Sequence, residues 1–396
     1  MSIRPLIIST PNPYGTGGQV RSYHVLKEIR SYLDDPGLIL IGSPKEVVEE
    51  FVHEKYQVLS FSEQYLNPNL AVFIRYFADI LNWLRNNKKS SYSIIVSQAE
   101  NPQHVLTAYL IASHLKVPWT TILASYTCLD PAYSIKTKIS LAYPSFLSKY
   151  CRLLLTHRLL NRTLVHPVSQ AIPIHLESRG FSLKHYHLLE VPIGVDHNFI
   201  DGILQGKTVD KKYDLAYMAR LVPEKGIFDL IRIIYLLKNR GVDANIIVIG
   251  DFENEKMKRK YFDAIRSLNL SKNFVFAGYL SGKAKYLRLA ESKVFVYPSR
   301  ADANPIVLLE ALSVGLPAVT YSMPYTLDYN TDSVIKANNV ETIVQEIVNL
   351  LKDPSLREKL GVEARLFSKK FTWKRVALSE LNAYYRTIEW YRNRIK

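Results

Sequence analysis

Short apolar segments alternate with helical segments along most of this chain of 396 residues, and that alternation constrains its fold more than any other feature. A short continuous apolar run bounded by turn residues indicates a buried strand, whereas apolar residues at helical spacing indicate an amphipathic helix. Strands separated by helices are typical of parallel α/β sheets. Because the chain is longer than one hydrophobic core usually supports, the sequence predicts two doubly wound α/β domains.

The predicted elements fall into two sets, and Pro and Gly punctuate the pattern between them at 191–196. The strands of the first set are Pro5–Ser9, Gly37–Ile41, Ser93–Ser97 and Thr120–Ala124. Those of the second set are Tyr213–Met218, Ala244–Gly250, Asn273–Ala277, Val294–Tyr297 and Ala318–Thr320. The helices between them are Gln19–Tyr32, Gln103–His114, Ile227–Lys238, Asn254–Leu268, Lys283–Glu291, Pro305–Val314 and Val340–Leu351. We therefore expect domains at residues 1–196 and 197–373.

Composition excludes several classes of protein. A hydrophobic content of 47% excludes a disordered chain, and no apolar run is long enough for a membrane-spanning helix. The N-terminus has no signal-peptide pattern, so a cytoplasmic location is expected. The only cysteines, Cys128 and Cys151, lack the spacing of a metal site, so neither a disulfide framework nor a zinc site is predicted.

The net charge of +15 is unevenly distributed. Residues 131–189 contain eight Lys or Arg and one Glu, a local charge of +7. Within this stretch, residues 136–162 interleave basic side chains with Leu, Tyr and Phe, which fits an amphipathic surface resting on anionic lipid at the inner membrane face. A solvated face of a basic protein fits equally well. Nucleic acid is not expected as a partner, because no DNA- or RNA-binding motif accompanies the charge.

Two carboxylates, Asp302 and Glu310, bracket a predicted strand-to-helix turn. The apolar run Val294–Tyr297 is the strand, and the helix Pro305–Val314 has Pro at its first position, where a missing N–H costs nothing. Unpaired N–H groups and the positive dipole end at such a helix start suit a phosphate. The layout fits a nucleotide-sugar site, although on spacing alone an ordinary strand–loop–helix unit fits as well.

A pair of cations, Arg220 and Lys225, follows the first strand of the second half. Two cations beside a helix start are unfavourable for its dipole unless an anion accompanies them. Arg can bind two oxygens of a diphosphate at once, and Lys supplies a compact charge. The pattern favours a phosphate clamp over a solvated loop.

Glycines occur where several predicted strands end. Gly250 follows the second strand of the second half, and Gly278, with Tyr279 and Leu280 after it, follows the third. A glycine there lets a base or ribose approach the backbone, and a tight turn is the alternative.

The loop after the first strand carries Gly17 and Gly18, just before a predicted helix. It is not a dinucleotide fingerprint, because Val20 stands where the third glycine belongs. A simple turn is favoured for this segment taken alone.

In their order and spacing, these motifs resemble the nucleotide-sugar domain of retaining GT-B glycosyltransferases of family four. The runs that carry the resemblance are Ala219-Arg220-Leu221, Glu224-Lys225-Gly226, Val248-Ile249-Gly250-Asp251, Phe276-Ala277-Gly278-Tyr279-Leu280, Val296-Tyr297-Pro298-Ser299, Pro305-Ile306-Val307-Leu308-Leu309-Glu310-Ala311 and Gly315-Leu316-Pro317. The connector Pro192–Asp196 and the late Phe371-Thr372-Trp373 are similar as well. The resemblance is strong from Val191 to Pro317 and looser before it.

The resemblance implies the GT-B fold, with two facing Rossmann-like domains, an interdomain cleft and a terminal helix, 374–396, that packs back on the first domain. It also implies a retaining hexosyltransferase that moves a sugar from a nucleotide-diphosphate-sugar donor to a hydroxyl of a glycan or lipid-linked acceptor. No cofactor and no metal are expected, which agrees with the lack of an Asp-x-Asp pair.

Site roles follow from the same resemblance. Arg220 and Lys225 would neutralise the leaving diphosphate, Glu310 would hold the ribose hydroxyls, and Asp302 would orient the donor sugar. The other expected donor-binding residues are Gly250, Gly278, Tyr279, Leu280, Asn304, Pro305 and Ile306, of which the last three bring the helix N-terminus to the phosphates. The loop with Gly17 and Gly18 would lie near the donor phosphate and the acceptor.

Two departures from the family pattern keep an alternative open. Asp302 replaces the first of the family's paired glutamates, which moves the carboxylate back by about one methylene. After the strand Thr120–Ala124 the family usually carries His, whereas this chain continues Ser125-Tyr126-Thr127, with His104 as a possible substitute. The alternative is therefore a catalytically inactive glycosyltransferase-like protein that binds a glycan or a partner.

Overall fold

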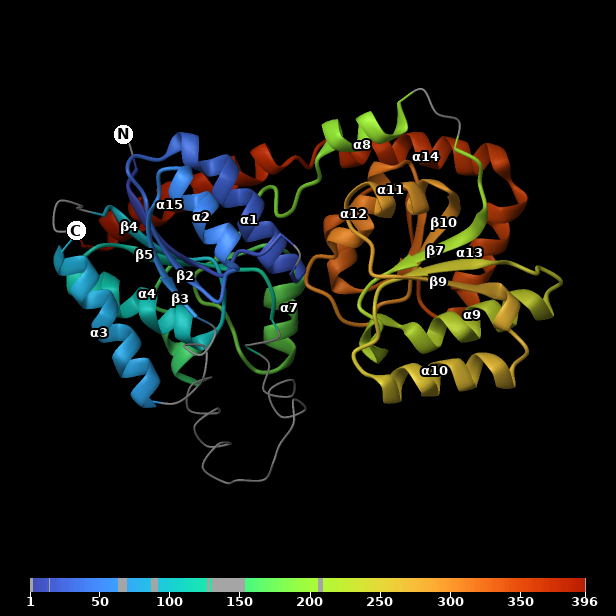
Figure 1. Cartoon of the computed structure of the whole chain (residues 1–396), viewed down its shortest axis with the longest axis horizontal. Helices are drawn as coiled ribbons and strands as arrows, with labels where there is room; N and C mark the ends of the chain where they lie inside the picture. Colours follow the sequence, from blue (N-terminus) through green and yellow to red (C-terminus); the bar gives the residue numbers. More distant parts are fainter. Residues whose placement is uncertain are drawn as a thin grey trace. The chain divides into compact units, whose positions relative to one another are not determined.

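The computed structural model describes residues 3–13, 15–62, 70–86, 92–126, 129, 154–205 and 209–395. The chain divides into two compact units, Met1–Ile193 with Trp373–Lys396, and Gly194–Thr372. Each unit has a six-stranded parallel sheet with helices on its faces (Figure 1). The predicted α/β class with two doubly wound, Rossmann-like domains is therefore confirmed.

The first unit holds the sheet β3-β2-β1-β4-β5-β6. Its strands are β1 (Pro5–Ser9), β2 (Gly37–Ile41), β3 (Gln57–Phe61), β4 (Ile94–Ser97), β5 (Trp119–Leu123) and β6 (His166–Pro167). Its helices include α1 (Gly17–Ile29), α2 (Lys45–His53), α3 (Leu70–Asn86), α4 (Pro102–Leu115), α7 (Ala171–Ser178) and α15 (Trp373–Ile395). The strands β1, β2, β4 and β5 are buried throughout, as the central strands of a parallel sheet between two helix layers should be.

Helix α15 completes the first unit although its residues come after the second unit in sequence. It packs along α1, where His24 stacks on Trp373 with ring centroids 4.4 Å apart. Arg21 is buried in α1 and pairs with Glu380 of α15, with 2.7 Å between Nη1 and Oε2. A buried charge is unfavourable without an opposite charge beside it, so Arg21 depends on Glu380 of α15. Helix α15 is therefore part of the core of the first unit.

The second unit holds the sheet β12-β11-β10-β7-β8-β9. Its strands are β7 (Tyr213–Met218), β8 (Ile246–Ile249), β9 (Phe274–Gly278), β10 (Ser292–Tyr297), β11 (Ala318–Tyr321) and β12 (Val334–Ala337). Its helices are α8 (His197–Leu204), α9 (Ile227–Asn239), α10 (Glu255–Ser267), α11 (Gly282–Ala290), α12 (Ile306–Ser313), α13 (Val340–Lys352) and α14 (Pro354–Ser368). In Figure 1, α9 and α10 lie on one face of this sheet, and α11 and α12 lie on the other.

The two sheets have the same topology. Counted from the first strand of each unit, the order is 3-2-1-4-5-6 in both. The connections reverse direction between β1 and β4 in the first unit and between β7 and β10 in the second. Ligands of doubly wound sheets bind at this switch point, beyond the carboxyl ends of the strands.

Some element boundaries differ from the prediction. The prediction that Pro305 is the first residue of α12 is wrong by one position, because its backbone is extended (φ −76°, ψ 101°) and the helix begins at Ile306. Strand β8 stops at Ile249 because Gly250 has a φ of +136°. Strand β3 was not predicted, since its half-exposed residues form no apolar run. Within the described residues, no helix combines the length and the apolar character needed to cross a bilayer.

Candidate functional site

The loops after β7 and β10 meet at the switch point of the second sheet, where Lys225 pairs with Asp302. The Nζ atom of Lys225 lies 2.5 Å from Oδ2 of Asp302, and it donates a hydrogen bond of 2.9 Å to the carbonyl oxygen of Ala301. Both side chains are largely buried. Two predicted site residues that are 77 positions apart are thus joined.

The backbones of these two loops also brace each other. Gly226 has a φ of +78°, and a Cβ there would come within 2.0 Å of the carbonyl oxygen of Pro298. The N–H of Arg300 donates to the carbonyl oxygen of Glu224 at 2.9 Å. Only glycine fits this close approach, so the sequence fixes the loop geometry that brings Lys225 to Asp302.

Asp302 is held by a hydroxyl as well as by a cation. The buried hydroxyl of Tyr297 donates to Oδ2 of Asp302 at 2.6 Å. Burial, followed by the nearby Asp302 charge, raises the pKa of Tyr297 well above its usual value, so this hydroxyl stays protonated and remains a donor. Asp302 is therefore kept as an oriented carboxylate at the end of β10.

Glu310 is buried on α12 and pairs with a residue that the sequence analysis did not select. The Nζ atom of Lys285, on α11, lies 2.5 Å from Oε1 of Glu310. The hydroxyl of Tyr286 donates to the same oxygen at 3.4 Å. Lys285 was missed because it belongs to no motif, and periodicity alone gives no reason to single it out on α11.

Arg220 and Gly250 lie at the same carboxyl edge. Arg220 lies two residues beyond the end of β7, after Ala219, and is exposed. A Cβ on Gly250 would stand 1.9 Å from the carbonyl oxygen of Ala219, so this glycine is required by the crossing of two chain segments. That observation favours a structural role for Gly250, in addition to the predicted contact with a ligand.

The end of β9 presents Gly278, Tyr279 and Leu280 at this edge. Gly278 has a φ of +67°, and its carbonyl oxygen accepts a hydrogen bond of 2.8 Å from the N–H of Gly250. The N–H of Tyr279 donates to Oδ1 of Asp251 at 3.2 Å, and the Tyr279 ring is 56% exposed. Leu280 is half-buried. The turn is thus fixed while its aromatic ring remains accessible.

Asn304, Pro305 and Ile306 form the start of α12. The hydroxyl of Tyr329 donates to the carbonyl oxygen of Pro305 at 2.9 Å and lies 3.5 Å from Oδ1 of Asn304. Because α12 begins at Ile306, the unpaired N–H groups of its first turn start there. The helix N-terminus therefore stands between the loop of Asp302 and the buried Glu310.

Gly17 and Gly18 belong to the first unit, where Gly17 opens α1. A Cβ on Gly18 would meet the Cβ of Ala124 at 3.5 Å, an ordinary contact. Beside them, the buried Glu100 accepts a hydrogen bond of 3.2 Å from the N–H of Ala124. Burial raises the pKa of Glu100 to about 7, against the lowering effect of the backbone N–H groups that it accepts. Glu100 was not predicted, and no motif marks it.

His104 lies buried in the first turn of α4. Its Nδ1 is 2.8 Å from Nδ2 of Asn101, and its backbone N–H donates to Oδ1 of the same Asn101, which caps the helix. Burial lowers the pKa of His104 to about 4, so the ring is neutral at pH 7. These contacts give His104 a structural role in the helix start.

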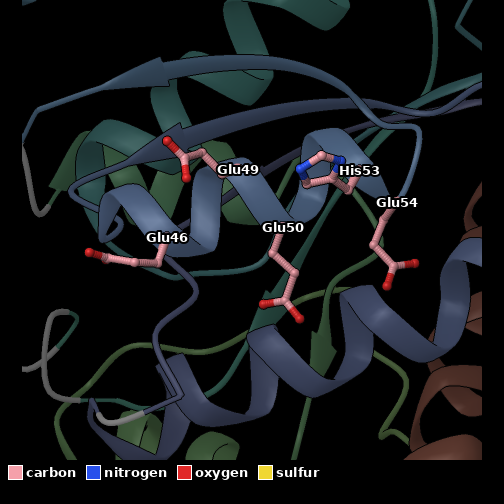
Figure 2. Close-up of a pocket in the computed structure, with 5 residues that line it drawn as sticks. All are labelled: Glu46, Glu49, Glu50, His53 and Glu54. Atoms are coloured by element: carbon pink, nitrogen blue, oxygen red, sulfur yellow. The ribbon is translucent and has the colours of Figure 1, made fainter.

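A hollow on α2 is lined by acidic side chains together with His53; its residues are Glu46, Glu49, Glu50, His53 and Glu54 (Figure 2). In Figure 2, Glu50 points toward the neighbouring helix, where it accepts hydrogen bonds from the Tyr23 hydroxyl at 2.8 Å and from Lys27 Nζ at 2.7 Å. This face therefore ties α2 to α1, and it has no part in the candidate site.

Two predictions fall wholly or largely outside the described residues. Residues 136–153 of the basic segment are outside them, as are Cys128 and Cys151. In the described part of the chain, no three His, Cys, Asp or Glu side chains are grouped as a metal site.

Two parallel sheets of identical order, with the site loops at the carboxyl edge of the second, define the GT-B fold of glycosyltransferases. A crystal structure of Anabaena HepE in complex with UDP and glucose has this fold, with a TM-score of 0.71 over 97% of this chain and all of that one, at 15% identity. Residues 204–367 match the model of the family described as glycosyl transferases group 1. That match supports the family which the motifs resemble.

Curated relatives point the same way. The capsular polysaccharide biosynthesis glycosyltransferase CapM of Staphylococcus aureus is 26% identical over 192 residues, which are 46% of this chain and 48% of CapM. The chain thus spans about half the length of this relative. An uncharacterised glycosyltransferase of Methanocaldococcus jannaschii, MJ1059, is 23% identical over 337 residues, covering 81% of this chain and 75% of that protein.

Proposed function

We propose that the protein is a retaining, metal-independent glycosyltransferase that moves a sugar from a nucleotide-diphosphate-sugar donor to a hydroxyl of a glycan or lipid-linked acceptor. The observation that carries the proposal is the Lys225–Asp302 pair at the switch point of the second sheet, beside the start of α12. HepE, which has the same fold, was crystallised with UDP and glucose. CapM is named for capsular polysaccharide biosynthesis, which favours a glycan as the acceptor.

The reaction separates charge between a sugar that becomes cationic and a diphosphate that departs. Fixed cations and dipoles stabilise such a transition state without reorganisation. Lys225 has three N–H donors, of which Ala301 and Asp302 take two, so one is left for a phosphate oxygen. Arg220 and the first turn of α12 would supply the remaining stabilisation of the leaving group.

The two carboxylates have separate parts in this proposal. Asp302, oriented by Lys225 and Tyr297, would accept hydrogen bonds from the sugar hydroxyls. Glu310 would accept hydrogen bonds from the ribose. Gly250, Gly278, Tyr279 and Leu280 would bound the nucleoside, and the loop of Gly17 and Gly18 would serve the acceptor.

Contact with an anionic membrane surface is part of the proposal for a lipid-linked acceptor. At the described end of the 136–162 segment, Leu154 and Leu155 are 38% and 42% exposed beside the exposed Arg158. Apolar and basic side chains on one surface suit an anionic bilayer. Co-sedimentation with vesicles that contain anionic phospholipid at low salt tests this contact, and its absence there would remove the membrane from the proposal.

A thermal-shift screen of the purified protein against UDP-, GDP- and ADP-sugars, with magnesium or with chelator, tests the donor site. A ligand that binds only the folded state raises the melting temperature. We expect one nucleotide series to do so in chelator, and Arg220→Ala to lose the shift. Retention is then tested by the anomeric configuration of the product, determined by NMR.

The second candidate is a catalytically inactive protein that binds a glycan or partner. Asp302 in place of Glu favours it, as does the run Ser125-Tyr126-Thr127 after the fifth strand, where the family usually carries a His. Hydrolysis of the donor by the purified protein, lost in Lys225→Ala, excludes this candidate. Binding of a donor without hydrolysis or transfer to any acceptor supports it.

A further inference from the structure

The ion pair between Lys285 and Glu310 differs from the exposed ion pairs on the helices of this chain. The two side chains are 19% and 9% exposed, and they come from two adjacent helices, α11 and α12. The Nζ atom of Lys285 also lies 4.8 Å from the ring centroid of the buried Tyr286. Burial of both charges is unfavourable unless they are well paired. Removal of Lys285 would therefore leave Glu310 as a buried carboxylate without a compensating charge.

The contacts of Glu310 are concentrated on one of its oxygens. Lys285 Nζ and the Tyr286 hydroxyl both approach Oε1, at 2.5 and 3.4 Å. Among the described residues, no side-chain contact of Oε2 accompanies them. A carboxylate with one oxygen anchored by a cation presents its other oxygen in a fixed direction.

We propose that Lys285 is a positioning residue of the donor site, which holds Glu310 so that its second carboxylate oxygen accepts hydrogen bonds from the vicinal hydroxyls of the donor ribose. The inference rests on the proposed function, because that function gives Glu310 the ribose. Lys285 itself need not touch the nucleotide. Its effect reaches the ligand through the charge and orientation of Glu310.

The chemistry of the carboxylate explains why a cation is needed. A hydroxyl that donates to an ionised carboxylate forms a stronger hydrogen bond than one that donates to a neutral acceptor. Loss of Lys285 removes both the charge and the anchor that make Oε2 a strong, directed acceptor. The loss should therefore appear specifically in the recognition of the ribose hydroxyls.

The test is the ratio of two dissociation constants, measured by calorimetry for a nucleoside diphosphate and its 2′,3′-dideoxy form. UDP, GDP and ADP are each used with their dideoxy counterparts. Wild type should bind the dideoxy form about 10- to 100-fold more weakly, the effect of losing hydrogen bonds to a charged group. Lys285→Met should bring this ratio to within about 3-fold, chiefly by weakening the ribonucleotide.

Three further variants separate positioning from a general loss of structure. Lys285→Arg keeps the cation and should retain most of the ratio, and Lys285→Gln, which keeps a donor without charge, should fall between. Lys283→Met is the matched control, because it removes the same charge from an exposed position on the same helix. It should leave the ratio at the wild-type value. Thermal melting of each variant establishes that it is folded.

A double-variant cycle tests whether Lys285 acts through Glu310. In a Glu310→Gln background, Lys285→Met should have no further effect on the ratio, because the shared carboxylate is gone. An additional loss there would overturn the proposal, as would a wild-type ratio in Lys285→Met. Tighter ribonucleotide binding by Lys285→Met would overturn it too, since Lys285 would then compete with the ribose.

These outcomes distinguish the two proposals. If wild type binds a nucleoside diphosphate and discriminates against its dideoxy form while Lys285→Met does the same, only the role of Lys285 fails. If wild type binds no nucleoside diphosphate, the donor site of the proposed function fails, and the role of Lys285 fails with it.

Discussion

The two units share a strand order and use its switch point differently. In the second unit, the charges after β7 and β10 remain at the sheet edge, where Lys225 and Asp302 are paired. In the first unit, the residue after β4, Gln98, donates to Glu380 of α15 at 2.5 Å, and Arg21 binds the other oxygen of Glu380. The same topology supplies two equivalent edges, and the side chains decide whether the polar groups at an edge pair with one another or with a helix of the core.

The first unit therefore has a polar interior that serves stability. Arg21 also donates to the carbonyl oxygen of Pro192 at 2.7 Å, and the Tyr384 hydroxyl donates to Glu380 at 2.6 Å. Burial and the Glu380 charge raise the pKa of Tyr384 well above its usual value. If this comparison is right, variants in the first network should lower stability, whereas variants in the second should lower transfer.

The largest effect should come from Arg21→Met. It leaves Glu380 buried without its cation, which should cost about 3–5 kcal/mol of unfolding free energy. Hydrogen exchange should show the loss in peptides of α1 and α15. Donor affinity of the folded protein should be unchanged, and Arg21→Met with Glu380→Leu should regain part of the stability. A weaker donor affinity at wild-type stability would contradict the assignment of the Arg21–Glu380 network to stability.

Lys225→Met should have the next largest effect, on transfer. Removal of a fixed cation from the leaving group should lower kcat about 10²- to 10³-fold while the unfolding free energy changes little. Glu310→Ala should also lower transfer strongly while the protein stays folded. The matched control is Lys293→Met. Lys293 of β10 pairs with Asp214 of β7 at 2.7 Å, within the two strands that precede the loops of Asp302 and Lys225. An equal loss of kcat in Lys293→Met would remove the special role of the switch point.

Gly226→Ala tests the bracing of the two site loops. The collision with Pro298 and the left-handed backbone should together cost about 2–3 kcal/mol. Gly241→Ala in the same unit has a similar φ, +76°, with nothing within 4 Å of the added Cβ, and should cost only about 1 kcal/mol. Urea melts of the two variants measure both losses of unfolding free energy. Equal costs would mean that the loops do not depend on this contact.

The smallest effect concerns pH and the first unit. Burial lowers the pKa of His104 to about 4 and that of His166 to about 3. Their contribution to the free energy of unfolding is therefore present above pH 6.5 and is lost as the pH falls. Glu100 acts oppositely, because its pKa is raised to about 7, and its contribution is lost as the pH rises from 4.5. For these three groups together, the unfolding free energy should fall by about 1.2 kcal/mol between pH 6 and 5.

Glu100→Gln isolates that opposing contribution. Without Glu100 nothing offsets the contribution of these two histidines, so the loss of unfolding free energy between pH 6 and 5 should rise to about 2.4 kcal/mol. Unfolding free energies from urea melts at the two pH values give the slope. A slope that Glu100→Gln leaves unchanged would show that Glu100 does not hold its proton in this range.

Much of the arrangement was predictable, because local patterns determine it. Apolar runs predicted β1, β2 and β7 at the bounds that the structure gives, and the loops with Lys225 and Asp302 follow from the strand ends. The partners of the site residues were not predictable. Lys285 and Glu310 meet because two helices pack, and Arg21 and Glu380 are 359 positions apart. Pairing across packed helices depends on tertiary geometry that no period in the sequence records.

The split of the first unit between the two ends of this sequence has a consequence for synthesis on the ribosome. The whole second unit emerges before α15 does, so it is free to fold while the first is still incomplete. Until Glu380 leaves the exit tunnel, Arg21 and Gln98 of the nascent first unit lack the acceptor that they share in the finished protein. A message cut short before Trp373 would thus yield one finished fold tethered to an unfinished one, a natural substrate for chaperones and proteases.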